Sequence, residues 1–117
     1  MIIIDRKISK DELREMQDHF FGDMVKAVVD LKRGVIALDS ELHADLESLL
    51  LEDGSVQWDL WGINLYPDAP SQDEYIEFDS IINIRPHQDN PSRFVMNPEV
   101  RESIAALVND LIEDVSA

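Results

Sequence analysis

Hydrophobic and polar residues alternate over residues 75–85, in the longest run of this kind in the chain. In an extended chain, one side of the run would carry Ile76, Phe78, Ser80, Ile82 and Ile84. Period-two alternation is typical of a strand with one buried face. Pro86 follows and would end the strand, because proline cannot donate to a ladder. We therefore predict a long central strand around which the other elements are arranged.

Two helices are predicted from their start signals. Ser9 and Glu12 have the spacing of a capping box, so a helix should run over residues 10–21 and stop at the glycine that follows. Asn97 followed by Pro98 is another typical helix start. The apolar face of this final helix would consist of Val100, Ile104, Leu107, Val108, Leu111 and Val115.

The remaining strands are shorter. Residues 2–4 form an apolar run, and residues 25–31 and 35–38 predict a hairpin whose loop ends in Gly34, which suits a left-handed turn. Residues 61–66 predict a further strand that stops at a proline. The polar loop after it should lead into the central strand as an antiparallel hairpin.

Residues 41–51 fit two interpretations. As a helix, their leucines form one apolar stripe. As a strand, residues 41–47 alternate strictly, and Asp53 with Gly54 would make a tight hairpin turn. Ala, Leu and Glu favour a helix, and no β-branched residue appears in this stretch before Val56. We therefore prefer the helix.

The resulting element order is β-α-β-β-α-β-β-α. Two hairpins combined with helices predict an α+β fold, in which helices pack on one face of a mainly antiparallel sheet. The chain of 117 residues has no linker and no internal repeat, so we expect a single domain over residues 1–117.

Composition narrows the class of protein. Hydrophobic residues make up 44% of the chain, as in globular domains, and no apolar run approaches a membrane span. The absence of cysteine excludes disulfides, a thiolate nucleophile and cysteine-bound metals. The net charge of −15 disfavours nucleic acid and anionic membranes, and it suits a basic partner or simply a soluble surface. We expect a cytoplasmic protein, and no motif indicates a cofactor.

A weakly basic segment follows the predicted central strand. Between residues 85 and 98, Arg85 and Arg93 outnumber the single Asp89, which gives a net charge of +1 in a strongly acidic chain. Arginine offers a planar fork to carboxylate or phosphate, so we predict a site for a small anionic or polar ligand. The alternative is that the arginines pair with some of the many carboxylates. The predicted ligand-binding residues are Arg85, Asn90, Arg93, Asn64 and Asn83.

A second candidate site lies within residues 41–47. On a helix, His43 and Glu47 are one turn apart and share a face, whereas Asp45 points away. On a strand, all three would project the same way and would make a better metal cluster. His43 would also suit a general base, which supports a metal-assisted hydrolase. An exposed polar helix face is the simpler interpretation.

Several short phrases resemble a small family of prokaryotic single-domain proteins of unknown function. They are ELHAD at residues 41–45, LWGINLYP at residues 60–67 and DSIINIRP at residues 79–86. The resemblance covers nearly the whole chain and implies a free-standing domain. It implies no activity, ligand or catalytic residue.

The sequence therefore supports three hypotheses about function. The first is a binding or regulatory module for a small anionic or polar ligand at Arg85 and Arg93. The second is a metal-assisted hydrolase that uses His43. The third is an acidic partner of a basic protein, whose complex would weaken as salt is added. The sequence predicts no oligomeric state.

Overall fold

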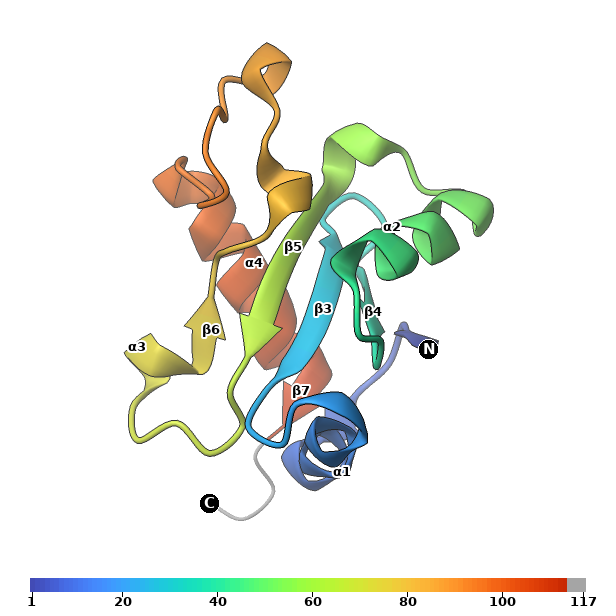
Figure 1. The fold of residues 1–117 in the computed structure, drawn as a ribbon, viewed down its shortest axis with the longest axis vertical. Helices are drawn as coiled ribbons and strands as arrows, with labels where there is room; N and C mark the ends of the chain where they lie inside the picture. Colours follow the sequence, from blue (N-terminus) through green and yellow to red (C-terminus); the bar gives the residue numbers. More distant parts are fainter. Residues whose placement is uncertain (114–117) are drawn as a thin grey trace.

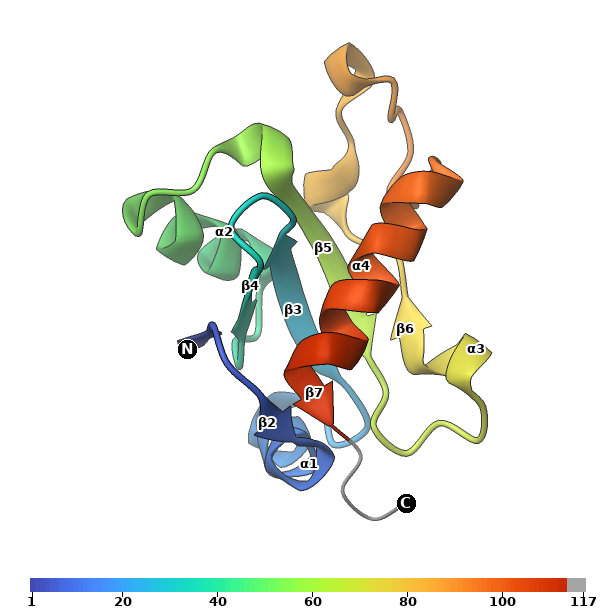
Figure 2. The same cartoon turned by 180° about the vertical axis from the view of Figure 1, so that it is seen from behind.

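The computed structural model describes residues 1–113 of the chain. Figure 1 shows a sheet with α2 in front of it and α4 behind it, and Figure 2 shows the same arrangement from the other side. The elements are, in order, β1 (Ile2–Ile4), β2 (Ile8–Ser9), α1 (Lys10–Phe20), β3 (Val25–Asp30), β4 (Val35–Leu38), α2 (His43–Glu52), η1 (Gln57–Asp59), β5 (Leu60–Leu65), α3 (Gln72–Tyr75), β6 (Ile76–Glu77), η2 (Ile81–Asn83), η3 (Pro86–Gln88), α4 (Pro98–Leu111) and β7 (Ile112–Glu113).

Five strands form one antiparallel sheet in the order β1-β4-β3-β5-β6. β3 lies at its centre and pairs over its whole length with β5, from Val25 opposite Leu65 to Asp30 opposite Leu60. The predicted hairpin is confirmed, because β3 and β4 pair across a loop in which Gly34 has a φ of 68°. The predicted strands at β1 and β5 are confirmed as well.

Helices cover both faces of this sheet. Ala27 and Val29 of β3 join the core formed with α1 and α4, whereas Val28 between them joins the core formed with α2. The α+β class with a mainly antiparallel sheet is confirmed. The helices do not all pack on one face as expected, because β3, β4 and β5 are buried on both sides.

Both predicted helix starts are confirmed. The Ser9 hydroxyl oxygen accepts the backbone N–H of Glu12 at 3.1 Å where α1 begins. The Asn97 side-chain oxygen accepts the N–H of Glu99 at 2.8 Å where α4 begins. Each bond satisfies a donor that the first helical turn would leave unpaired. Val115, which we predicted on the apolar face of the final helix, lies outside the described residues.

The ambiguity over residues 41–51 is resolved as a helix. α2 begins at His43, after a turn in which the Ser40 hydroxyl accepts the N–H of Leu42 at 3.3 Å. It ends before Gly54, whose φ is 106°. The strand interpretation of this stretch is therefore wrong, in agreement with the helical preference of Ala, Leu and Glu.

The predicted central strand over residues 75–85 is wrong beyond its first residues. Only Ile76 and Glu77 pair with β5, which confirms the start of the expected antiparallel hairpin. Ser80 then turns the chain, because its hydroxyl accepts the N–H of Ile82 at 3.3 Å and a short 3-10 helix follows. A local hydrogen bond of this kind competes with an extended backbone.

Asn83 takes the place that further strand residues would have beside β5. Its side-chain oxygen accepts the N–H of Gly62 at 2.8 Å, and its amide nitrogen donates to the carbonyl of Gly62 at 2.9 Å. One carboxamide thus satisfies both buried backbone groups of Gly62. A side chain at Gly62 would keep the loop that carries Ser80 and Asn83 from lying this close to β5, because the added Cβ would lie 2.6 Å from the Cβ of Ser80.

A second, two-stranded sheet joins segments that lie far apart in the sequence. β2 and β7 pair in parallel, with Ile8 opposite Ile112. The sequence did not predict this pair, because strands of two residues carry no periodic pattern. Among the described helices, none is both long and apolar enough to cross a membrane.

We predict that Gly62→Ala lowers the free energy of unfolding by about 1–3 kcal/mol, the usual cost of overpacking. The physical reason is the clash with Ser80, whose Cβ and Oγ would lie 2.6 and 2.7 Å from the new methyl group. Urea denaturation of the wild type, of Gly62→Ala, of Ser80→Gly and of the double variant measures the energetic coupling between the two positions. In the Ser80→Gly background the alanine should cost clearly less. Equal costs in both backgrounds would contradict the close approach.

Candidate functional site

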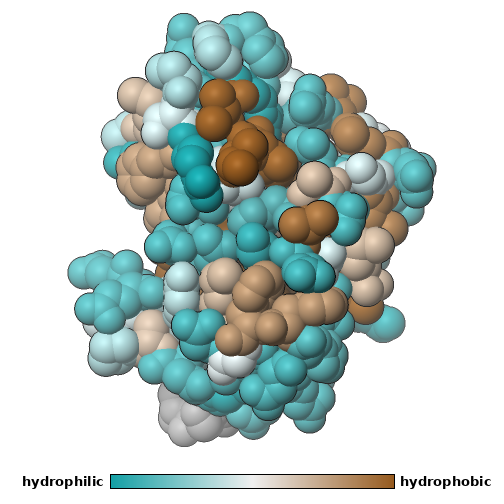
Figure 3. All heavy atoms as spheres, in the orientation of Figure 1, coloured by the Kyte–Doolittle hydropathy of each residue, from teal (hydrophilic) through white to brown (hydrophobic). Residues whose placement is uncertain are grey.

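A groove of about 770 Å³ opens beside β6, at one edge of the five-stranded sheet. In Figure 3 the outline of the molecule is indented on the left, between the lobe that holds α3 and the loops above it. The groove is lined by Asp23, Tyr66, Asp68, Ala69, Pro70, Asp73, Glu74, Ile76, Glu77, Phe78, Phe94 and Arg101.

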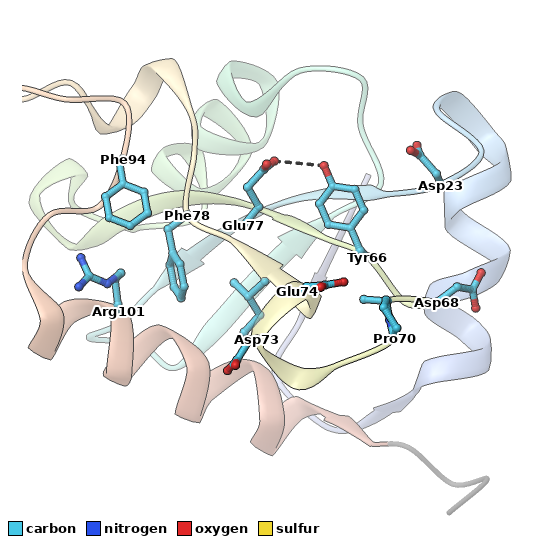
Figure 4. Close-up of a pocket in the computed structure, with 12 residues that line it drawn as sticks. Asp23, Tyr66, Asp68, Pro70, Asp73, Glu74, Glu77, Phe78, Phe94 and Arg101 are labelled. Atoms are coloured by element: carbon cyan, nitrogen blue, oxygen red, sulfur yellow. Dashed lines mark hydrogen bonds between the residues drawn. The ribbon is translucent and has the colours of Figure 1, made fainter.

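The two ends of the groove differ in chemistry. Figure 4 shows Phe78, Phe94 and Arg101 together at one end, and Asp68 and Pro70 at the other. The rings of Phe78 and Phe94 meet edge to face, with 6.4 Å between their centroids. The guanidinium of Arg101 lies 5.0 Å from the centroid of the Phe94 ring. One end is therefore aromatic and carries a cation, and the other is polar and acidic.

Negative charge dominates the lining. Arg101 is the one lysine or arginine among the lining residues that the structure describes. The carboxylates belong to Asp23, Asp68, Asp73, Glu74 and Glu77. An excess of one sign in a concave site raises the local concentration of ligands of the opposite sign. The groove therefore suits a cation with an apolar portion.

Asp68 is the one lining carboxylate for which the described chain provides a cationic partner. Gln17 donates to one of its oxygens at 3.0 Å, and Arg14 donates to the other at 2.9 Å. The hydrogen bond from Gln17, followed by that from Arg14, holds the pKa of Asp68 below its ordinary value of 3.8. Its charge is thus partly offset, and the other four carboxylates supply most of the excess.

Glu77 is oriented by two neutral donors. The Tyr66 hydroxyl donates to Oε1 of Glu77 at 3.1 Å, and Asn64 donates to the same oxygen at 2.8 Å. Burial, and then the charge of Glu77, raise the pKa of Tyr66 above its ordinary value of 10.0, so the hydroxyl remains a donor at neutral pH. These two hydrogen bonds hold the carboxylate of Glu77 in a fixed position. Asn64, predicted to bind a ligand directly, thus contacts a groove residue.

Arg85 belongs to the loop that follows η2 and is buried, with 2% of its surface exposed. Its guanidinium donates to the carbonyls of Leu60 and Gln57, at 2.7 Å for Gln57. Its Nε donates to the carbonyl of Ile82 at 3.0 Å, and the group stacks over the Trp61 ring at 4.6 Å. Burial lowers the pKa of Arg85 from its ordinary value. This guanidinium therefore binds groups of its own chain, namely three backbone carbonyls and the side-chain oxygen of Gln88.

Asn90 is also buried and holds the same loop. Its amide nitrogen donates to the carbonyls of Asn83 and Ser92, at 2.8 and 2.9 Å. Its oxygen accepts the N–H of Met96 at 2.9 Å. The backbone of Asn90 pairs with that of Arg85 in both directions. Arg85, Asn83 and Asn90 thus belong to one network that fixes the loop.

The side chain of Arg93 lies outside this network. It is exposed, and its Nε donates to a carboxylate oxygen of Asp79 at 3.0 Å. The guanidinium groups of Arg85 and Arg93 share no partner among the described residues. The anion site predicted from these two arginines stays a prediction, and the contacts of Arg85 favour a role in holding the loop.

His43 is buried at the start of α2. Its Nε2 donates to the carbonyl of Ile63 at 2.8 Å, because a carbonyl oxygen can only accept. Burial lowers the pKa of His43 below its ordinary value of 6.5. Asp45 is exposed and Glu47 is partly buried. Within the described residues, no three His, Cys, Asp or Glu side chains are placed to hold a metal ion, and the hydrolase hypothesis stays a prediction.

Sequence reasoning missed the groove, because its residues come from separate segments. They belong to the turn before β3, residues 66–74, β6 and its exit, and the region around the start of α4. One sequence signal was available, namely three acidic residues within the two-proline loop over residues 67–74. The sequence by itself predicts only a polar connection between two strands there.

Comparisons with known proteins give a family and no activity. A family model described as "Protein of unknown function (DUF5674)" matches residues 2–111. No curated protein and no solved structure matches the chain.

We predict that Arg85→Met lowers the free energy of unfolding by about 3 kcal/mol, because buried carbonyls lose their charged donor. Arg93→Met is the matched control. It removes an exposed ion pair and should cost less than about 1 kcal/mol. Urea denaturation measures both variants. Similar losses would show that the two arginines do not differ in the way their burial indicates.

Stability should also depend on the protonation of His43. Its pKa is lower in the folded chain than its ordinary value of 6.5, so the unfolded chain binds the proton more readily. The stabilisation is therefore present above pH 6.5 and is lost as pH falls through the folded pKa. His43→Gln should flatten the stability profile below about pH 6.5. His87→Gln, at an exposed histidine, is the control, and an unchanged slope in His43→Gln would refute the assignment.

Proposed function

The chain belongs to the DUF5674 family, whose description assigns no function, and we propose that it is a binding module for a basic segment of a partner protein. The segment lies in the groove beside β6. The observation that carries this proposal is a lining in which five carboxylates accompany a row of aromatic and aliphatic side chains. This proposal takes up the hypothesis of an acidic partner for a basic protein and assigns the binding site to the groove.

Two properties of the groove favour a cationic side chain. The carboxylates of Asp73, Glu74 and Glu77 attract the charged head. The rings of Tyr66 and Phe78 give the aliphatic stem of lysine or arginine an apolar surface. Arginine and lysine carry both features in one side chain, so they fit the groove better than a purely apolar ligand does.

The charge of the whole molecule acts in the same direction. With a net charge of −15, the chain attracts basic proteins before contact and speeds their association. The same field repels the small anion that the first hypothesis invoked. Because the predicted anion site also relies on Arg85, whose donors bind backbone carbonyls, we rank it below the groove.

A small organic cation is the alternative occupant, because the volume of the groove is within the usual range for small-molecule sites. The spread of charge favours a protein segment. The carboxylates come from three separate parts of the chain and lie along the groove, whereas a compact cation would need them to converge on one point. We place the interaction in the cytoplasm, as expected from the sequence.

We predict that an oligo-arginine amide binds the protein and an oligo-glutamate amide does not. The affinity should fall about tenfold between about 50 and 300 mM salt, as expected for contacts between partly exposed charges. Fluorescence anisotropy of the labelled peptide measures both. A complex whose affinity does not change with salt would argue against the groove.

Two variants that remove the same charge at different positions distinguish the contribution of the groove to binding from that of the net charge. Asp73→Asn with Glu74→Gln should weaken binding severalfold. Glu41→Gln with Asp89→Asn removes the same charge at exposed positions outside the lining, and Asn is tolerated at the left-handed φ of 59° at Asp89. This control should bind like the wild type. An equal loss in both variants would mean that only net charge matters.

A further inference from the structure

The groove lies along an edge of the sheet, because β6 is the last strand in the order β1-β4-β3-β5-β6. β5 occupies one side of β6, with Asn64 opposite Glu77 and Leu65 opposite Ile76. The backbone N–H of Tyr66 donates to the carbonyl of Tyr75 at 2.9 Å. Hydrogen-bonded pairs alternate in an antiparallel ladder, so the N–H and C=O of Ile76 point away from β5.

Residues 93–95 already use the same edge, one step further along. Ser80 donates its N–H to the carbonyl of Arg93, and Val95 donates to the carbonyl of Phe78, both at 3.1 Å. Asp79 and Phe94 form an antiparallel bridge. This row continues the sheet past β6 and shows that the edge accepts an extended segment.

The row stops before it reaches Ile76. In the register set by Asp79 and Phe94, Asn97 would lie opposite Ile76. Asn97 instead caps α4, and Pro98 begins that helix without an N–H to donate. The chain turns away where the backbone of Ile76 points outward. Ile76 also lines the groove, so this part of the edge borders the proposed binding site.

Side chains on the two faces of this edge differ. Ile76 and Phe78 belong to the core on the α4 side. Glu77 lies between them in sequence and points to the other face, where it contacts Tyr66 and Asn64. A strand added here would therefore meet apolar groups on one face and a carboxylate on the other.

We propose that the partner segment binds as an added strand beside β6, in line with residues 93–95, and pairs its backbone with Ile76. This inference rests on the proposed function and specifies its partner. The bound segment is extended, with apolar side chains on the face of Ile76 and Phe78 alternating with basic side chains on the face of Glu77. Backbone pairing supplies affinity, and the alternation supplies specificity.

Four probes test the strand. They are a short capped peptide in which Leu and Arg alternate, a peptide of the same composition in two blocks, the alternating peptide with N-methyl groups on its central residues, and spermine. The alternating peptide should bind about tenfold more tightly than the block and methylated peptides, because only it combines the alternation with free N–H donors. It should also slow hydrogen exchange at the Ile76 amide, with the Gly54 amide as internal control.

The outcomes separate this inference from the proposed function. Similar affinities for all cationic probes, with unchanged exchange at Ile76, would overturn the added strand and leave a groove for cations. Tighter binding of the block peptide would overturn it as well. If no cationic probe binds, both the groove and the strand are wrong. Preference for the alternating peptide together with protection of Ile76 supports both.

Discussion

The carboxamide of Asn83 attaches the loop after β6 to the sheet, and the groove depends on this attachment. It binds both backbone groups of Gly62 on β5. Its nitrogen also donates to the carbonyl of Arg93 at 3.1 Å, which ties β5 to the segment that carries Phe94. A buried amide that is fully paired fixes geometry, because any displacement leaves polar groups unsatisfied. One end of the groove is therefore positioned by β5, the strand next to the edge of the sheet.

The fold was predictable where its signals are local. Ser9 and Asn97 cap helices through hydrogen bonds within the first turn, so the sequence contains the whole arrangement. The alternation over residues 75–85 did not give a long strand, because a local hydrogen bond at Ser80 turns the chain and a distant contact then fixes the turned segment. That distant contact joins Asn83 to Gly62, and nothing near Asn83 in the sequence indicates this partner. The sequence also did not reveal that helices cover the second face of the sheet, although the fully apolar β4 was consistent with burial on both faces.

The candidate site was less predictable than the fold. Acidic composition indicated a basic partner, but the location of the groove requires Glu74, Phe94 and Arg101 to meet, and only tertiary structure brings them together. For Arg85, the sequence indicated a binding residue where the structure shows contacts within the chain. A sequence does not distinguish a guanidinium that binds a ligand from one that binds carbonyls of its own chain, because both need the same planar donors.

The position of α4 has a consequence for synthesis on the ribosome. This helix covers one apolar face of a sheet whose strands all come earlier in the chain, and it supplies Ile104 and Val108 to that core. While translation proceeds, residues such as Ile63 leave the exit tunnel before their cover exists. Until α4 has emerged, the nascent chain exposes an aggregation-prone hydrophobic surface of the kind that chaperones bind.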